Sequence, residues 1–283
     1  MLRVLITGAD SYIGTRLNEY LSAFLGTYEM AEMDLRGAWN AESFRGFDAV
    51  IHVAGIAHMR ENADNRALYS AVNRDLALQA ARAAKEQGVR QFVFFSSMSV
   101  YGLCSGRITA QTMPKPNTCY GISKWEAEQA LTALADESFC VAVLRPPMIY
   151  GRGCKGNYPR LSKLIVKLPL WPCVENERSM LYIGCLCAFM HRLLQSGRGG
   201  LFFPQNKEYV STNELAKQIA RAHGKRLWQF KGLGRLISAL CERVPTLAKL
   251  FGTLTYDQSM SSAFEDEPQP SFEQTIQETE AWA

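Results

Sequence analysis

The stretch Val4-Leu5-Ile6-Thr7-Gly8-Ala9-Asp10-Ser11-Tyr12-Ile13-Gly14 decides the fold, because it joins an apolar strand to a helix through a glycine-containing turn. Backbone that passes close to a pyrophosphate needs residues without a Cβ, and a helix N-terminus there offers N–H groups and partial positive charge. Gly8 and Gly14 occupy the outer positions of a G-x-x-G-x-x-G pattern, and Ser11 replaces the middle glycine. A serine hydroxyl can itself bind a phosphate, so the stretch predicts either a dinucleotide-binding turn or a plain strand-to-helix turn.

Short apolar runs alternate with helical patterns through the first two-thirds of the chain, which is typical of a parallel sheet wrapped by helices. Runs that are almost wholly apolar, such as Phe92-Val93-Phe94-Phe95, suit strands that are buried on both faces. We therefore predict an α/β fold, a Rossmann-type doubly wound parallel sheet with a smaller C-terminal substrate-binding domain. The expected strands are Val4–Thr7, Tyr28–Met33, Ala49–Ala54, Gln91–Ser96 and Cys140–Leu144, and the expected helices are Ile13–Phe24, Asn65–Gln87 and Ser123–Ala135.

The pattern changes after Arg145, where two prolines and a glycine-rich stretch begin a region rich in loops. The first domain is expected to cover residues 1–155 and about 182–206, and the second about 156–181 and 207–283. Helices are predicted at Leu161–Leu168, Cys185–Gln195, Thr212–Ala222 and Phe272–Trp282, with a late strand at Gly200–Pro204 and a polar linker at Glu265–Gln269.

The composition is that of a soluble globular protein, with 47% hydrophobic and 20% charged residues. A net charge of +4 is too small and too dispersed to predict nucleic-acid binding. No apolar run approaches the roughly 20 residues of a membrane span, and the N-terminus reads as a strand rather than a signal peptide. The eight cysteines show neither metal-ligand spacing nor a disulfide framework, so we expect reduced thiols, no bound metal and a cytoplasmic protein.

Asp34 ends the second expected strand, at the distance from the glycine turn where an acid usually binds the adenosine ribose hydroxyls. A carboxylate there repels a 2′-phosphate, which favours NAD over NADP. Arg36 lies two residues further on and keeps NADP open, and a solvated acid at the strand end is the structural alternative.

Tyr120 and Lys124 lie four residues apart, one helical turn from each other on the same face. A tyrosine is a poor base near its ordinary pKa of about 10, and a neighbouring ammonium is expected to lower that pKa. Ser97 follows the fourth expected strand, at the sheet edge where active sites of open parallel sheets lie. The three side chains predict acid–base assistance to hydride transfer at an alcohol or ketone.

In this order and spacing, these motifs resemble the extended short-chain dehydrogenase/reductases, the NAD-dependent epimerase/dehydratase family. Further segments that carry the resemblance are Ile51-His52-Val53-Ala54-Gly55, Phe95-Ser96-Ser97-Met98-Ser99-Val100-Tyr101-Gly102, Arg145-Pro146-Pro147-Met148-Ile149-Tyr150-Gly151 and Arg178-Ser179-Met180-Leu181-Tyr182-Ile183. The resemblance spans nearly the whole chain and is strongest to sugar-nucleotide epimerases and 4-ketoreductases. It also implies a homodimer, formed through the helices Asn65–Gln87 and Ser123–Ala135.

The resemblance implies a role for each matched residue. Ser97 would polarise the substrate oxygen, Tyr120 would act as acid and base, and Lys124 would hold the nicotinamide ribose. The residues implied to bind the cofactor, NAD rather than NADP, are Gly8, Ser11, Tyr12, Ile13, Gly14, Asp34, Ala54, Gly55, Asn73, Lys124 and Pro146. The residues expected to bind the substrate, a nucleotide sugar such as a UDP-sugar, are Ser97, Met98, Tyr120, Asn157 and Arg178.

The substrate half departs from the family pattern at two positions. Met148 stands where many sugar-nucleotide enzymes have a phosphate-binding asparagine, and Ala57 replaces a frequent basic residue, with His58 beside it. Arg178 matches an arginine that contacts the substrate diphosphate, and a surface ion pair with Glu175 or Glu177 is the alternative.

Three functions stay open on the sequence. The first is epimerase or 4-ketoreductase chemistry on a nucleotide sugar; dehydration is disfavoured because Met98 and Ser99 replace the acids that dehydratases carry there. The second is reduction or oxidation of a non-nucleotide alcohol or ketone, and the third is non-catalytic dinucleotide sensing. The basic, amphipathic segment Trp228–Tyr256 predicts either helices packed over the substrate pocket or a membrane-surface element.

Overall fold

The computed structural model describes residues 1–8, 10–57, 63–230, 232, 234–241, 243–263 and 269–281. The chain divides into two compact units. Unit 1 comprises Met1–Gly102, Met113–Pro146 and Cys187–Pro204, and unit 2 comprises Leu103–Thr112, Pro147–Leu186 and Gln205–Ala283.

Unit 1 contains a parallel six-stranded sheet in the order β10-β6-β4-β3-β1-β2. The order reverses between β1 and β3, and in doubly wound sheets ligands bind at the carboxyl ends of the two strands beside such a reversal. The expected Rossmann-type sheet is therefore confirmed. Its strands are β1 (Leu2–Thr7), β2 (Tyr28–Met33), β3 (Ala49–His52), β4 (Gln91–Phe95), β6 (Cys140–Leu144) and β10 (Gly200–Phe202).

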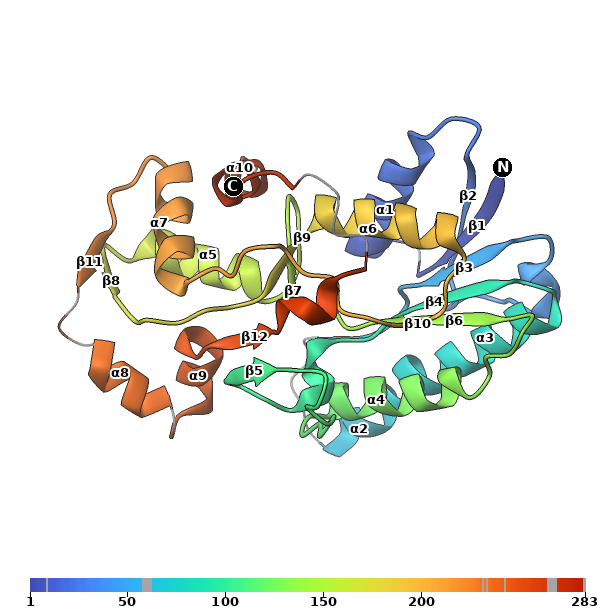
Figure 1. Ribbon diagram of the computed structural model, residues 1–283, viewed down its shortest axis with the longest axis horizontal. Helices are drawn as coiled ribbons and strands as arrows, with labels where there is room; N and C mark the ends of the chain where they lie inside the picture. Colours follow the sequence, from blue (N-terminus) through green and yellow to red (C-terminus); the bar gives the residue numbers. More distant parts are fainter. Residues whose placement is uncertain are drawn as a thin grey trace. The chain divides into compact units, whose positions relative to one another are not determined.

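Helices cover both faces of this sheet, with α1 and α6 on one side and α3 and α4 on the other (Figure 1). Helix α3 turns Ala77, Ala80 and Ala84 inward, and all three are fully buried. Such small side chains let a helix approach the sheet closely while the buried Phe92 and Phe94 of β4 fill the interior. The helices are α1 (Tyr12–Ser22), α2 (Ala63–Ser70), the π-helical segment η2 (Ala71–Asp75), α3 (Leu76–Glu86), α4 (Cys119–Thr132) and α6 (Ile183–Ser196), with 3-10 turns η1 (Ala41–Phe44) and η3 (Met98–Tyr101).

Unit 2 has a core of its own around the buried Tyr150 and Trp171, packed between short strand pairs and helices. The pairs are parallel: β7 with β9, β8 with β11 and β12 with β5. The elements are β5 (Gly106–Ile108), β7 (Met148–Tyr150), α5 (Asn157–Lys167), β8 (Leu170–Pro172), β9 (Met180–Tyr182), α7 (Thr212–Ala222), β11 (Trp228–Phe230), α8 (Gly234–Cys241), α9 (Pro245–Phe251), β12 (Leu254–Tyr256), η4 (Gln258–Ser261) and α10 (Phe272–Glu280).

The units differ from the predicted domains at residues 103–112 and 147–155, which belong to unit 2. The reason is strand pairing: Arg107 of β5 pairs with Thr255 of β12, and Ile149 of β7 pairs with Leu181 of β9. These partners lie far apart in the sequence, and no local pattern marks them.

Several helices and strands begin, end or are interrupted at residues other than those predicted. The helix expected at Asn65–Gln87 is broken by η2, and the one expected at Ser123–Ala135 begins earlier, at Cys119. The segment Trp228–Tyr256 contains two short helices flanked by strands β11 and β12 rather than helices alone. Most of the predicted linker Glu265–Gln269 and the end of the last predicted helix, at Trp282, lie outside the described residues.

Candidate active site

The turn after β1 leaves no room for a side chain at Gly8 or Gly14. Gly8 has φ +105°, and a Cβ built there would lie 2.6 Å from the backbone nitrogen of Ala54. A Cβ at Gly14 would lie 2.7 Å from Ser11 Oγ and 3.2 Å from the Ile6 side chain. Both glycines are therefore required by the close passage of β1, α1 and the segment after β3.

Ser11 caps α1, because its Oγ accepts a hydrogen bond of 3.1 Å from the Gly14 N–H. Tyr12 and Ile13 follow as the first helical residues, and first-turn N–H groups have no carbonyl partner within their own helix. The serine at the middle-glycine position thus strengthens the helix start that a diphosphate would use. The residues present fit a dinucleotide here.

Asp34 directly follows β2, at the sheet edge where the turn lies. Its carboxylate accepts two matched bonds from Arg36, Nε to Oδ1 at 2.9 Å and Nη2 to Oδ2 at 2.9 Å. Hydrogen bonds from Arg36 lower the pKa of Asp34, so the carboxylate stays ionised. Both side chains are substantially exposed. Asp34, the acid expected at the ribose position, therefore forms an ion pair with Arg36, the cation that had kept NADP open.

Ser97 and Tyr120 are brought together from the end of β4 and the start of α4. Ser97 caps η3 through the Ser99 N–H at 3.1 Å, and its side chain hydrogen-bonds Tyr120. Burial raises the pKa of Tyr120, and the bond with Ser97 opposes that shift. The ring of Tyr69 meets the Tyr120 ring edge-on, with centroids 6.3 Å apart. The expected serine–tyrosine pair exists, but the expected lowering of the tyrosine pKa does not.

Lys124 is buried one turn after Tyr120, and its ammonium donates to the Phe95 carbonyl oxygen at 2.7 Å. The ammonium also lies 4.6 Å from the centre of the Phe94 ring. Burial lowers the pKa of Lys124 to about 8, while the negative charge of Glu128 acts in the opposite direction. Lys124 is thus held in place by strand β4. Because its pKa is about 8, the ammonium is mostly protonated at neutral pH.

Asn73 ties the loop after β3 to helix α4. Its amide accepts from the Ile56 N–H at 2.9 Å and donates to the Ile56 oxygen at 3.1 Å and to Ser123 Oγ at 3.0 Å. A Cβ at Gly55 would lie 3.0 Å from Asn73 Oδ1 and 3.4 Å from Lys124 Nζ. The cofactor-lining segment expected at Ala54 and Gly55 therefore packs directly on the expected catalytic lysine.

A buried ionic network behind Lys124 was missing from the sequence prediction. Glu128 binds Arg145 through contacts of 3.0 Å and 3.1 Å to Nε and 2.5 Å to Nη2, and it also accepts from Ser96. Arg145 Nη1 donates to the Tyr101 hydroxyl at 2.7 Å. Glu128 lies one turn beyond Lys124, a spacing that could have indicated a shared helix face. The pairing with Arg145 depends on the sheet.

Two further predicted residues, Met98 and Pro146, meet in unit 1. The Met98 N–H donates to the Pro146 carbonyl oxygen at 3.0 Å, and both side chains are buried. This bond links the segment after β4 to the segment after β6. His58 lies outside the described residues.

The remaining predicted substrate residues, Asn157 and Arg178, belong to unit 2. Asn157 is exposed at the start of α5. Arg178 is mostly covered between Val210 and Leu254, donates to the Gly252 oxygen at 2.9 Å, and has its pKa lowered by burial.

The ion pair considered as the alternative for Arg178 does not form. Glu175 and Glu177 are both described and exposed; the guanidinium instead donates to the Gly252 oxygen, and neither glutamate is among the charges that shift the pKa of Arg178. Met148, which replaces the family's asparagine, lies half-buried in β7 beside Met180 of β9.

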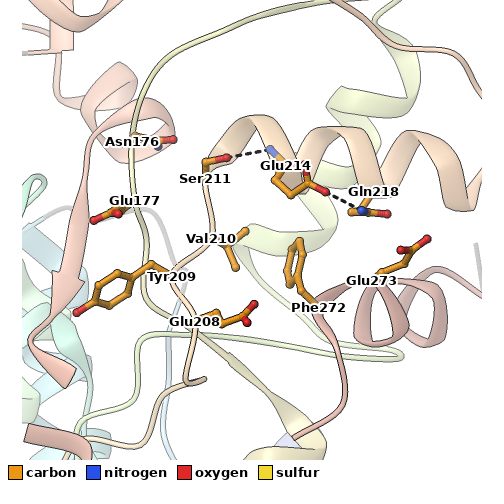
Figure 2. A pocket seen from close by; sticks show the side chains of 10 residues that line it. All are labelled: Asn176, Glu177, Glu208, Tyr209, Val210, Ser211, Glu214, Gln218, Phe272 and Glu273. Atoms are coloured by element: carbon orange, nitrogen blue, oxygen red, sulfur yellow. Dashed lines mark hydrogen bonds between the residues drawn. The ribbon is translucent and has the colours of Figure 1, made fainter. Parts of the chain in front are cut away.

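Unit 2 also contains a pocket of about 490 Å³ at the start of α7. Figure 2 shows Ser211 bonded to the Glu214 N–H, and Glu214 in turn bonded to Gln218. Four glutamates line this pocket, so its walls would repel a phosphate. The lining residues are Asn176, Glu177, Glu208, Tyr209, Val210, Ser211, Glu214, Gln218, Phe272 and Glu273.

Comparison with known proteins identifies related sequences and folds. The model of the NAD dependent epimerase/dehydratase family matches residues 4–202. A UDP-glucose 4-epimerase of Vibrio cholerae is 29% identical over 288 residues, covering 90% of this chain and 87% of the relative. An N-acetyl-alpha-D-glucosaminyl-diphospho-ditrans,octacis-undecaprenol 4-epimerase of Escherichia coli O157:H7 is 27% identical, covering 79% of this chain and 73% of the relative. The UDP-glucuronic acid 4-epimerase of Bacillus cereus, solved with NAD, shares the fold at 18% identity, with a TM-score of 0.79 over 99% of this chain and 98% of that one.

Proposed function

The chain belongs to the NAD dependent epimerase/dehydratase family, and from that premise we propose that it acts at C4 of a diphosphate-linked sugar, as an epimerase or a 4-keto reductase/dehydrogenase. The observation that carries the proposal is that Ser97 hydrogen-bonds Tyr120, with the buried Lys124 one helical turn further on, beside a turn that admits no side chain at Gly8. Sensing proteins without catalysis have no need of such an acid–base pair.

The residues of unit 1 would hold NAD as follows. The α1 N-terminus, with Ser11, Tyr12 and Ile13, receives the diphosphate, and Asp34 receives the adenosine ribose. Gly55 and Pro146 line the path toward Lys124, which Asn73 supports through the loop after β3. When bound, NAD supplies the acceptor and donor of hydride.

Tyr120 is the acid and base in this proposal. As a phenolate its oxygen takes the proton of the sugar hydroxyl at C4, and as the resulting phenol it returns that proton to the keto oxygen. Ser97, already bonded to Tyr120, donates to the same substrate oxygen and stabilises charge that develops there. Lys124 holds a positive charge near the pair because the Phe95 carbonyl and Glu128 favour its protonated form.

Replacing Tyr120 with Phe tests the proposal. We expect turnover of a UDP-sugar to fall about 100- to 10,000-fold, the usual contribution of a positioned acid or base, with NAD binding unchanged. Tyr69→Phe is the matched control, since it removes a neighbouring hydroxyl and keeps the ring, and it should retain most activity. Unchanged turnover in Tyr120→Phe would overturn the mechanism.

Two assays separate the variants of the proposal. An epimerase returns the hydride to the same sugar, so C4 inversion should proceed without net NADH, whereas a reductase consumes one cofactor per turnover. Thermal-shift measurements with uridine and thymidine diphosphates test the nucleotide. Met148 at the asparagine position favours the second candidate, a dehydrogenase or reductase of a non-nucleotide alcohol or ketone. Absence of stabilisation by either diphosphate would support that candidate.

A further inference from the structure

The small parallel sheet of β8 and β11 belongs to unit 2 (Figure 1), and large apolar side chains on one of its faces are exposed to solvent. Its register pairs Trp228 with Leu170 and Phe230 with Pro172, so these four side chains share a face. Trp171, between them, points the other way and is 1% exposed in the core. Trp228, Leu170 and Phe230 are instead 67%, 59% and 51% exposed. The inner face of this sheet thus packs into the core through Trp171, and its outer face exposes large apolar side chains.

The end of α5 extends this face. Leu164 and Leu168 are exposed, and the run from Lys167 to Leu170 is exposed without interruption. The Trp228 N–H donates to the Pro169 oxygen at 3.0 Å, which ties β11 to that run. We name this surface the Trp228 patch; it comprises Leu164, Leu168, Leu170, Trp228 and Phe230.

Exposed basic residues lie in the same two segments as the Trp228 patch. Lys163 and Lys167 are exposed on α5, and Lys225 and Arg226 are exposed just before β11. Lys225 Nζ also donates to the Val166 oxygen at 2.8 Å, so its charge is held at the edge of the patch. The sequence segments 157–172 and 221–251 together contain ten of the 31 Lys and Arg residues but one of the 27 Asp and Glu residues. The other 21 basic and 26 acidic residues carry a net charge of −5, so positive charge is concentrated in these two segments.

We propose that the Trp228 patch docks on an anionic lipid surface. Tryptophan and phenylalanine enter the boundary between headgroups and acyl chains, and flanking lysines bind lipid phosphates. A second copy of the chain fits less well, because a two-fold contact through this patch would set lysines against lysines. Protein interfaces are also poor in lysine. No helix in the described part of the chain is long and apolar enough to cross a membrane, so this attachment is peripheral.

Vesicle co-sedimentation tests the proposal without any measurement of turnover, so its failure is distinct from a failure of the proposed function. The protein should pellet with vesicles rich in phosphatidylglycerol at low salt. It should stay in the supernatant when the vesicles are phosphatidylcholine, or when the salt concentration is high. Lys163→Glu/Lys167→Glu should weaken partitioning at least tenfold, since each basic residue near such a surface contributes about fivefold. Trp228→Ser/Phe230→Ser should weaken it by a similar factor.

Matched variants control for charge and for apolar area. Arg82→Glu/Lys115→Glu reverses two exposed charges of unit 1, and Leu25→Ser/Met113→Ser removes two exposed apolar side chains there. All variants must unfold at the wild-type temperature within a few degrees, and the two controls should pellet like the wild type. If the wild type stays in the supernatant, or the patch variants pellet like the controls, the proposal is wrong. If the patch variants instead change the sedimentation coefficient of the free protein, the patch is a self-association surface and lipid docking is rejected.

Discussion

Among the described residues, each unit buries one carboxylate, and the two are paired in different ways. In unit 1, Glu128 is paired with the guanidinium of Arg145, which stays charged at every accessible pH. In unit 2, Glu280 accepts from the hydroxyls of Tyr158 at 2.6 Å and Ser162 at 2.9 Å, with His223 Nε2 at 2.8 Å. The first arrangement fastens α4 to the sheet beside Lys124 with a permanent charge pair. The second fastens α10 to α5 and α7 mainly with hydroxyl groups and one titratable ring.

The comparison shows that the permanently charged pair, Glu128 with Arg145, is the one that lies beside Lys124, where the chemistry is proposed. Arg145 binds Glu128 and Tyr101 at once, so it ties the end of β6 to α4 and to the turn η3 that follows β4. The Glu280 cluster holds a single terminal helix. We therefore expect damage to the first cluster to unfold unit 1, and damage to the second to release α10 alone.

Removing Glu128 should have the largest effect. Glu128→Ala leaves the Arg145 charge buried without a partner, which costs about 3–5 kcal/mol of unfolding free energy. Replacing both members, as in Glu128→Leu/Arg145→Met, should recover most of that loss because the Arg145 charge is no longer buried without its partner. Urea unfolding of the three proteins measures this. If the single and double variants lose the same unfolding free energy, the pair stabilises the protein through packing rather than through charge.

Glu280→Gln should have a smaller effect. An amide keeps the shape but brings donors toward the Tyr158 and Ser162 hydroxyls, and an imperfectly paired buried group costs about 1–3 kcal/mol. Hydrogen exchange should show the amides of α10 opening before the rest of unit 2. Global unfolding at the Glu128→Ala level would contradict the proposed difference between the two clusters.

His52 should control the response of unit 1 to acid. Burial, followed by the charge of Lys124, lowers the pKa of His52 to about 3, against 6.5 in the unfolded chain. Between these values the unfolded state binds more protons, so stability present above pH 6.5 is lost as pH falls toward 3, by up to about 1.4 kcal/mol per pH unit.

His52→Asn tests this assignment. Its unfolding free energy should decline less steeply than that of the wild type between pH 6.5 and 4.5, in urea titrations at each pH. An unchanged slope would show that His52 does not set the acid sensitivity of unit 1.

Local patterns carried much of the prediction. The apolar strands and the Ser211 cap of α7 follow from patterns within a few residues, and the structure has both. Gly8 is also visible in the sequence, but its steric reason is not local, because a Cβ there would meet the backbone of Ala54. The earlier start of α4 also had a local signal, because the Thr118 hydroxyl accepts from the Gly121 N–H, as an N-cap does. Glycine in that first turn concealed the helix start.

Other features needed contacts between distant segments. The π-helical turn around Asn73 interrupts an apolar helical pattern, and the Asn73 amide there binds the backbone of Ile56 and the side chain of Ser123. The outward face of β11 could not be read from Trp228 and Phe230, since aromatic residues more often fill a core. Pairing with β8, whose Trp171 occupies the inner side, decides which side of that sheet meets water.

The sequence by itself determined the class of fold, the glycine turn after β1 and the family, because glycine spacing, strand hydrophobicity and the four-residue interval from Tyr120 to Lys124 can be read within short segments of the chain. Only the tertiary structure decided in which direction the pKa values of Tyr120 and Lys124 shift. Lys124 is held by the Phe95 carbonyl and Glu128 by Arg145, and burial depends on how β4, β6 and α4 pack together. A pKa follows from the surroundings of a charge, and those surroundings come from segments that the sequence leaves far apart.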